Sequence, residues 1–505
     1  MLPNFDRTGL KLWACLLVGL LGAIFVGNLL GEEGEYGAIK VAVAAGISLF
    51  FFTSYTWWWV PIPAMFALGG FLYFGFKMYL FEVGMVLCVI PLLVASALKP
   101  SSVLQKRGRL PVRFWLTAVF IGVHAMWSVF LARYYREGGF TNILRQYSFA
   151  EWGIIFCCIF YWCGSTRFLR RALVFFFVAY LIRVVVGLVN FYFPVFLYLP
   201  GVNYVLPMLS DDLRAAGLGL AAVAICYASL ASFWMARFFH VIIAIIAGAS
   251  VFMGGGRTAA VLVLFLPLFL ALIKRKISWL VGSAALVICF VAFLNIFSPQ
   301  VAMLDSRVQR ALSPLLLDRS GAAFSVQTES SDIWHQRLRE VAISRWLDNP
   351  VSFLFGNRIK RFDPLKFLQT GIATYDFDSA LDQAMDLATY ESGWFTVLSG
   401  AGLVGGVLFV SVLVLLLRSS LARLIKRGLN DVTGAFCFLA SYNILVWLVF
   451  GWTTGGWPSY EIMLGTIAYG ACLDENRAPK SSSNLQNTGF RRRDVGRLAA
   501  VPSVG

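Results

Sequence analysis

The sequence predicts an all-α polytopic membrane protein with about 12–14 transmembrane helices and one large, mainly helical loop domain on one side of the membrane. Hydrophobic residues make up 59% of the chain and charged residues 13%, whereas soluble domains carry about 25% charged residues. Apolar runs of roughly 20 residues, the length of a helix that crosses a bilayer, recur along the chain. A polar stretch over 298–393 interrupts them and holds twelve of the 26 acidic residues.

Fourteen apolar runs are candidate spans. They lie at 12–31, 40–58, 60–76, 79–98, 114–132, 149–166, 172–190, 217–235, 238–254, 257–273, 277–297, 394–417, 432–452 and 459–473. Two are doubtful, because only Trp59-Val60-Pro61 separates the second from the third and only Met235-Ala236-Arg237 separates the eighth from the ninth. The first run is too long for the apolar core of a signal peptide, so we expect it to be retained.

These runs divide the chain into four parts. An N-terminal bundle of about 11 spans covers 1–297, the loop domain covers 298–393, and C-terminal transmembrane helices cover 394–473. The last part, 474–505, is rich in Ser, Asn and Arg and poor in apolar residues. Such a composition cannot bury enough apolar surface to fold, so it predicts a disordered tail.

The basic residues predict which way the chain faces. With a cytoplasmic amino terminus, every strong basic cluster falls on the cytoplasmic side, as the bias of Lys and Arg toward that side requires. The clusters lie at 99–113, 167–171, 274–276, 418–427 and 491–493. The loop domain is then outside and both termini are cytoplasmic. In a Gram-negative bacterium this places the chain in the inner membrane, with the loop domain in the periplasm.

Other residue patterns exclude some classes of partner. The net charge of +16 comes from clusters between apolar spans that lack interleaved aromatic residues, so we expect the lipid bilayer, not nucleic acid, as the partner. All nine Cys lie in or beside apolar runs, which argues against a disulfide framework. His124, His240 and His335 are too scattered for a zinc site, and no metal is expected.

Two arginines in or beside spans are candidate functional residues, because an ionisable side chain inside a bilayer is costly. Arg183 lies mid-span among aliphatic residues and either pairs with an acid such as Glu151 or faces a polar cavity. Arg257 follows three consecutive glycines at the predicted outer start of a span. Glycines allow a ligand or another backbone to approach closely; alternatively, Arg257 only extends to the bilayer surface.

A helix is predicted over 332–347, ended by the Asn349-Pro350 turn. At 100° per residue, Arg337 falls on one polar face with Glu340, which predicts an ion pair. Arg339 falls on the other side, next to apolar residues. A buried guanidinium needs an anionic partner, so Arg339 is the better candidate to face a ligand, with a structural salt bridge as the alternative.

Four motifs follow one another on the predicted outer face. Arg257 opens the span two before the loop, and the helix with Arg337 and Arg339 precedes Asn349-Pro350. Arg345 is followed by ten residues and Gly356, and Glu391-Ser392 by nine residues and Gly402-Leu403-Val404-Gly405. Over about 240–417 this order resembles the O-antigen polymerase and O-antigen ligase superfamily, which has many spans and one large periplasmic loop near the carboxyl end. Where the family has His, this chain has Glu391, and this departure favours a polymerase over a ligase.

The resemblance implies a glycosyltransferase that joins glycans carried on undecaprenyl pyrophosphate at the periplasmic face. It implies inversion at the anomeric carbon and no metal, nucleotide sugar or other cofactor. Arg257 and Arg339, supported by Arg337 or Arg183, would stabilise the leaving diphosphate. Glu391 would be the general base for the acceptor hydroxyl, or else only a carboxylate favoured by the dipole at a helix start.

Three further residues complete the substrate-binding candidates. His335 and Arg345 belong to the predicted loop helix, and Trp394 follows directly on the loop. Trp394 either stacks on a sugar ring or anchors the chain at the bilayer surface. A chain-length co-polymerase is a further candidate partner for a polymerase.

Two other functions remain open. A ligase would transfer finished glycan to lipid A core or to protein. A flippase or transporter of lipid-linked oligosaccharide belongs to a different class, and its path would need charged residues spread through the spans. Here Arg183 is nearly alone at mid-membrane, while charge concentrates in the loop domain.

Overall fold

The computed structural model describes residues 61–73, 77–80, 110–134, 166–193, 197–199, 204–206, 210–317, 322–356, 390–453 and 456–477. The spans predicted at 12–31 and 40–58, almost all of those at 79–98 and 149–166, and the tail beyond 477 lie outside these residues. Loop residues 357–389 also lie outside them.

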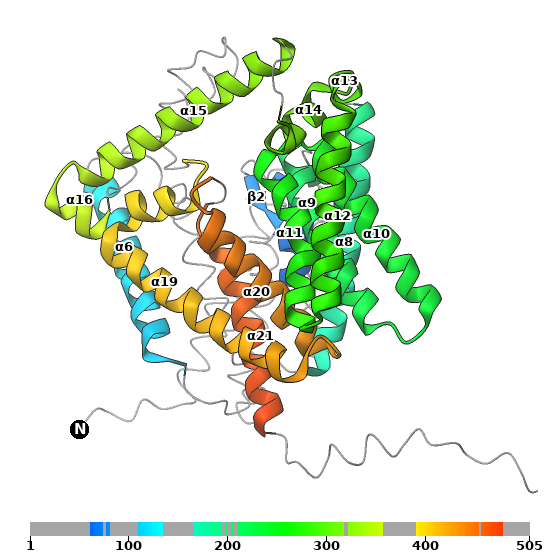
Figure 1. Cartoon of the computed structure of the whole chain (residues 1–505). Coiled ribbons are helices and arrows are strands. Elements are labelled where there is room, and N and C mark those ends of the chain that lie inside the picture. The colour runs from blue at the N-terminus through cyan, green and yellow to red at the C-terminus, as the bar shows by residue number, and fades with distance from the viewer. Residues whose placement is uncertain are drawn as a thin grey trace, which may run out of the picture.

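Long helices dominate the described residues (Figure 1). They are α6 (Val112–Tyr134), α8 (Thr166–Tyr192), α9 (Ser210–Leu230), α10 (Trp234–Met253), α11 (Arg257–Lys274), α12 (Ile277–Ile296), α19 (Gly393–Arg427), α20 (Val432–Phe450) and α21 (Ser459–Arg477). Among the described helices, seven are long and apolar enough to cross a membrane: α8 to α12, α19 and α20. The structure therefore confirms a multi-pass helical membrane protein. The doubtful eighth and ninth spans are two helices, since α9 ends at Leu230 and α10 begins at Trp234.

The span predicted over 60–76 is wrong. Helix α3 (Pro61–Leu68) ends at Gly69 and Gly70, whose φ angles of 71° and 79° break the helix. The chain continues as β1 (Phe71–Tyr73), which belongs to a small antiparallel sheet. The sheet has the order β2-β1-β4-β3, with β2 (Lys77–Tyr79), β3 (Leu197–Leu199) and β4 (Tyr204–Leu206). Hydropathy could not predict it, because β1 pairs with a segment more than a hundred residues away.

Arg183 of α8 contacts the end of this broken helix. Its Nη1 donates a hydrogen bond to the carbonyl oxygen of Ala67 at 3.3 Å. Its guanidinium also lies against Gly69, where an added Cβ would be 3.4 Å from Cζ. The last carbonyls of a helix carry partial negative charge, which suits a cation. The candidate partner Glu151 lies outside the described residues.

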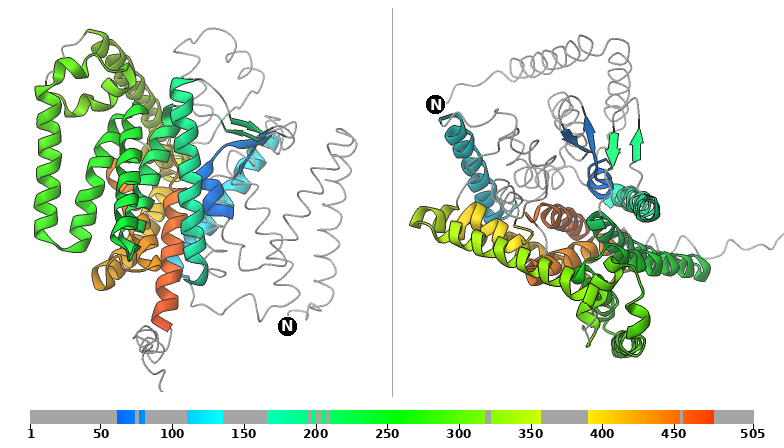
Figure 2. Two further views of the ribbon diagram at one scale, coloured as in Figure 1. Left: turned by 90° about the vertical axis from the view of Figure 1, so that its right-hand side faces the viewer. Right: turned by 90° about the horizontal axis from the view of Figure 1, so that it is seen from above.

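The described part of the loop domain is helical and lies over one end of the bundle. It contains α13 (Ser298–Val301), α14 (Ser306–Leu312), a 3₁₀ turn (Ser313–Leu315), α15 (Ala322–Leu347) and α16 (Pro350–Phe355). Helix α15 crosses above the membrane helices from α14 to α16, as seen in Figure 1 and in the right-hand view of Figure 2. Its end at Leu347 agrees with the prediction, whereas it begins ten residues before the predicted start at 332. The Asn349 side chain caps α16 by accepting a hydrogen bond from the Ser352 amide at 2.8 Å.

Two motif glycines bring α16 against α19. Gly402 interrupts α19 with φ 66° and ψ −170°, and Gly356 ends α16 with φ 87°. A Cβ added to either residue would overlap the backbone of the other segment. His124 of α6 supports the same junction, with Nε2 3.0 Å from the carbonyl oxygen of Phe355. The glycines that follow Arg345 and Glu391 in the motifs therefore allow close backbone contact between α16 and α19.

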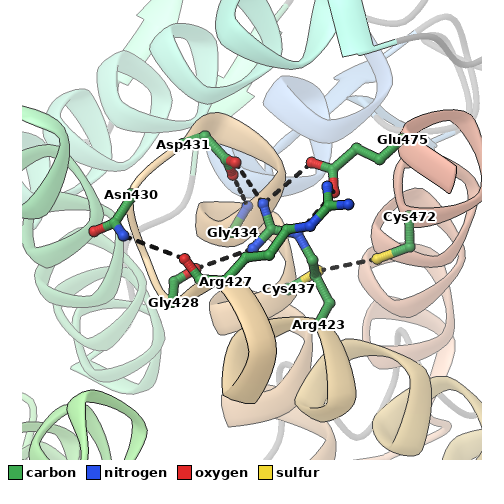
Figure 3. Close-up of polar contacts among 9 residues, drawn as sticks. All are labelled: Arg423, Arg427, Gly428, Asn430, Asp431, Gly434, Cys437, Cys472 and Glu475. Carbon is green, nitrogen blue, oxygen red and sulfur yellow. Dashed lines mark hydrogen bonds and ion pairs between the residues drawn. The ribbon is translucent and has the colours of Figure 1, made fainter. Parts of the chain in front are cut away.

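A cluster of ion pairs connects α19, α20 and α21 where α19 ends, at the end of the bundle away from α15 (Figure 3). Arg423 of α19 is buried and donates from Nε to Glu475 of α21 at 2.9 Å and from Nη2 to Asp431, before α20. Arg427 also donates to Glu475, at 2.7 Å. Just beside the cluster, the Sγ atoms of Cys437 and Cys472 are 3.5 Å apart. These contacts hold the α19–α20 turn against α21.

Candidate functional site

A cavity of about 680 Å³ lies beneath α15, where α9 and α11 begin, α19 begins and α20 ends. Its volume is within the range of roughly 300–1,000 Å³ that is usual for small-ligand sites. The wall residues are Arg214, Ala215, Leu218, Arg257, Thr258, Ala259, Leu262, Arg310, Asp332, His335, Arg339, Tyr390, Glu391, Ser392, Val446, Trp452 and Thr453. The candidates Arg257, Arg339, Glu391 and His335, which come from three separate parts of the sequence, thus share one cavity.

Four guanidinium groups and two carboxylates line this cavity, which leaves an excess of two positive charges. Arg257 comes from α11 and Arg339 from α15, both as candidates from the sequence. Arg214 of α9 and Arg310 of α14 also line the cavity but were not predicted from the sequence. Each lies near other polar residues and belongs to none of the motifs, so neither stood out as a candidate. Burial and the nearby charge of Arg257 lower the pKa of Arg310. Such a concentration of positive charge favours an anionic ligand.

The glycines before α11 make room for one of these arginines. A Cβ added to Gly256 would overlap the Arg214 side chain and lie 2.8 Å from its Nη1. Gly255, with φ 74°, lies against the backbone of Arg307. The three consecutive glycines predicted that another part of the chain or a ligand approaches closely here. In the structure α9 and α14 make this close approach.

Arg257 also joins the bundle to the loop domain. Its Nη2 donates to Oδ1 of Asp332 on α15. This hydrogen bond lowers the pKa of Asp332, so the carboxylate stays charged at neutral pH. Asp332 was not predicted as a site residue, because the loop domain contains many acidic residues and nothing in the sequence distinguishes this one.

One face of α15 supplies the roof of the cavity. Asp332, His335 and Arg339 follow one another at helical spacing and all line it. Arg339 donates from Nε to the carbonyl oxygen of His335 at 3.0 Å. Arg337 is not among the wall residues, and its Nη1 lies 3.8 Å from Oε2 of Glu340, the ion pair expected from the spacing.

Glu391 is held by its two neighbours at the point where the chain re-enters the bundle. The Tyr390 side chain is buried against Ala342 of α15, and Ser392 Oγ donates to the carbonyl oxygen of Gly451 at 2.8 Å. Between these anchors Glu391 has φ 50°. A non-glycine residue is rare in this left-handed region and costs about 1–2 kcal/mol there. The surrounding contacts thus hold the carboxylate at the cavity in a conformation that it would not adopt alone.

His335 faces this carboxylate. Its Nδ1 lies 3.4 Å from Oε2 of Glu391, with the two side chains 31% and 52% exposed. Burial lowers the pKa of His335, and Arg257, Arg310 and Arg339 lower it further, while Glu391 opposes them. Because the net shift is downward from the ordinary value near 6.5, the imidazole is neutral at neutral pH.

The other sequence candidates lie outside the cavity wall. Trp394 packs between Trp447 and Trp452, with both ring centroids at 5.3 Å, and donates from Nε1 to Leu448. Trp452 of this stack is the one that lines the cavity. Arg345 and Arg183 are not among the wall residues. Within the described part of the chain, no three His, Cys, Asp or Glu side chains gather as a metal site.

Comparison of the chain with models of known protein families finds no match, and comparison with curated proteins finds no similar sequence.

Proposed function

We propose that this chain is a membrane glycosyltransferase that polymerises glycan repeat units carried on undecaprenyl pyrophosphate. The observation that supports it is the convergence of four guanidinium groups with the Glu391–His335 pair around one cavity. An anion site next to an acid–base pair suits a reaction in which a diphosphate leaves as a hydroxyl attacks. The four ordered motifs that resemble the polymerase and ligase superfamily support the same assignment.

The arginines would bind the diphosphate of the donor. Departure of the lipid diphosphate breaks the bond to the anomeric carbon and leaves negative charge on its oxygens. Arg257 and Arg339 would stabilise this charge, helped by Arg214 and Arg310, which the sequence did not indicate. Guanidinium groups suit this role because they stay charged and make paired hydrogen bonds to phosphate oxygens.

The Glu391–His335 pair would accept the proton of the attacking hydroxyl. That hydroxyl belongs to a second lipid-linked glycan, and its oxygen forms the new bond to the anomeric carbon as the diphosphate leaves. Attack from the opposite side inverts the configuration at that carbon. No nucleotide sugar takes part in this exchange.

The helix ends support an outward-facing site, with the cavity on the periplasmic side. The basic residues Lys274 and Arg427 stand at the far ends of α11 and α19. The first residues of α11 line the cavity, and α19 begins directly after the lining residue Ser392. Because Lys and Arg concentrate on the cytoplasmic side, the cavity end would face outward in the inner membrane. Ser325→Cys in intact cells should then react with a membrane-impermeant thiol reagent to a greater extent than the parent chain, which has nine cysteines of its own. A variant reached only after the cells are opened would contradict this orientation.

Glu391→Gln tests the reaction. In the native cells, replacing the chain with this variant should abolish polymer while its amount and membrane insertion stay normal, because the pair loses its charge. Single repeat units should accumulate on lipid, as extraction and mass spectrometry would reveal. Long chains on lipid would instead indicate a ligase, and units retained on the cytoplasmic side a flippase. Wild-type chain length would exclude Glu391 from the reaction.

Gly256→Ala tests the anion site. The φ of −89° at this position suits any residue, so the methyl group acts only by displacing Arg214. We expect purified protein in nanodiscs to bind inorganic pyrophosphate roughly 10–100-fold more weakly by calorimetry, the loss of one charge-assisted hydrogen bond. Gly282→Ala in α12 is the matched control, because its Cβ would meet no atom within 4 Å. Equal affinity in the two variants would remove Arg214 from the site.

A further inference from the structure

We infer that His335 is the residue that takes the proton from the acceptor hydroxyl, and that Glu391 positions its imidazole. This inference rests on the proposed glycosyl transfer and divides the work of the pair between its two members. The assignment differs from the sequence-based expectation, in which Glu391 itself is the base. It follows from where α15 and the re-entry segment bring the two side chains.

The geometry assigns a different task to each nitrogen of His335. Nδ1 faces Oε2 of Glu391 at 3.4 Å, and both residues line the cavity. A carboxylate beside Nδ1 favours the tautomer with its proton on that nitrogen. Nε2 is then the nitrogen with a lone pair to accept a proton. A carboxylate beside an imidazole also stabilises the imidazolium that forms during proton transfer.

The backbone around Glu391 is anchored on both sides. Tyr390 is buried on one side of it and Ser392 is bonded to Gly451 on the other. These contacts hold the backbone of Glu391 in the left-handed region, which an unconstrained residue rarely adopts. His335 lies instead on the roof helix, three residues after Asp332 and four before Arg339, which is a candidate ligand of the diphosphate. The imidazole therefore lines the same cavity as the arginines. The sugar would lie between them, so that the hydroxyl attacks on the side opposite the diphosphate.

The charges around His335 suit a base. Arg257 from α11, Arg310 from α14 and Arg339 from α15 disfavour its protonated form, as burial does. Glu391 favours the protonated form, and Asp332 on the same helix is the second carboxylate nearby. The imidazole is neutral before the reaction, and the adjacent carboxylate moderates the cost of charging it during the reaction.

The acceptor O–H bond breaks and its proton moves to Nε2 of His335. The oxygen forms a bond to the anomeric carbon, and the carbon–oxygen bond to the diphosphate breaks, with its electron pair on the leaving group. The imidazolium then returns its proton to solvent or to the departing diphosphate.

Nuclear magnetic resonance tests the geometry without any turnover. The chain has three histidines, so ¹⁵N-histidine labelling in nanodiscs, with His335→Gln to assign the signal, isolates His335. At pH 7 we expect a neutral ring with the proton on Nδ1 and a pKa below 6.5. Glu391→Gln should lower the pKa further, because the carboxylate that raises it is gone, and should weaken the tautomer preference. A ring protonated on Nε2, or unaffected by Glu391→Gln, would overturn the inference.

Polymer synthesis in the native cells supplies the second arm. His335→Gln should reduce chain growth about 10²–10⁴-fold, the usual contribution of a general base. The exposed neighbour Gln336 supplies the control, Gln336→Ala, which should retain wild-type polymer. If His335→Gln elongates normally while Glu391→Gln does not, Glu391 alone is the base and the glycosyltransferase proposal stands. If neither variant nor Arg339→Ala changes the polymer, the proposed function itself fails.

Discussion

Arg339→Ala should abolish polymer, whereas Arg337→Ala, two residues away on the same helix, should leave it close to normal. Arg339 lines the cavity, and Arg337 pairs with Glu340 on an exposed face. Removing one preorganised donor to a developing negative charge costs a reaction about 10²–10³-fold. Losing a solvent-exposed ion pair costs about 0–1 kcal/mol of stability and no catalysis.

These two variants control for each other. Both replace Arg with Ala in α15, so the changes in charge and helix propensity are the same. Polymer length on gels, normalised to membrane-inserted protein, is the measurement. Equal losses in both variants would mean that the loop domain tolerates no change of charge. A larger loss in Arg337→Ala would show that the face of α15 assigned to the ligand is wrong.

Arg423→Ala should destabilise the protein by about 3 kcal/mol. Removing one partner of a buried ion pair leaves the other charge uncompensated, at a cost of about 3–5 kcal/mol. The lower end applies here because Asp431 is 50% exposed and Glu475 keeps its bond to Arg427. Within the cluster drawn in Figure 3, we therefore expect Arg423 to contribute most of the stabilising free energy, because its side chain is only 6% exposed.

Arg427→Ala is the matched control for that cluster. Arg427 donates to the same Glu475 but is 53% exposed, so its loss should cost less than about 1 kcal/mol. Thermal unfolding in detergent, followed by tryptophan fluorescence, compares the two variants with the parent. If the two midpoints fall by similar amounts, burial does not decide the strength of these contacts.

The sequence predicted the long helices well, because apolar length alone marks a membrane span. Helices α11, α12 and α20 begin at the predicted residues. The failure over 60–76 has a physical cause: the Gly69-Gly70 pair ends α3, and β1 then pairs with a distant hairpin that no local pattern reveals. Hydropathy detects the apolar run over 60–76 but not the end of the helix within it.

The site was predicted in part for similar reasons. Arg257, Arg339 and Glu391 stood out through helical spacing and motif order, and the structure brings them into one cavity. Arg214 and Arg310 follow no such pattern. They reach the cavity only through the tertiary packing of α9 and α14, which the local sequence does not reveal. Trp394 was a candidate for sugar stacking, whereas the ring that reaches the cavity belongs to its stacking partner Trp452.

The hydrogen bond between Arg257 and Asp332 would make the contact of α15 with α11 depend on whether an anion occupies the cavity. An anion that binds Arg257 competes with Asp332 for one guanidinium, so arrival of the ligand exchanges an internal counter-ion for an external one. An anion bound to Arg257 would therefore weaken this contact between α11 and α15. In the structure Asp332 serves as the counter-ion of this guanidinium, and it would do so again once the anion departs.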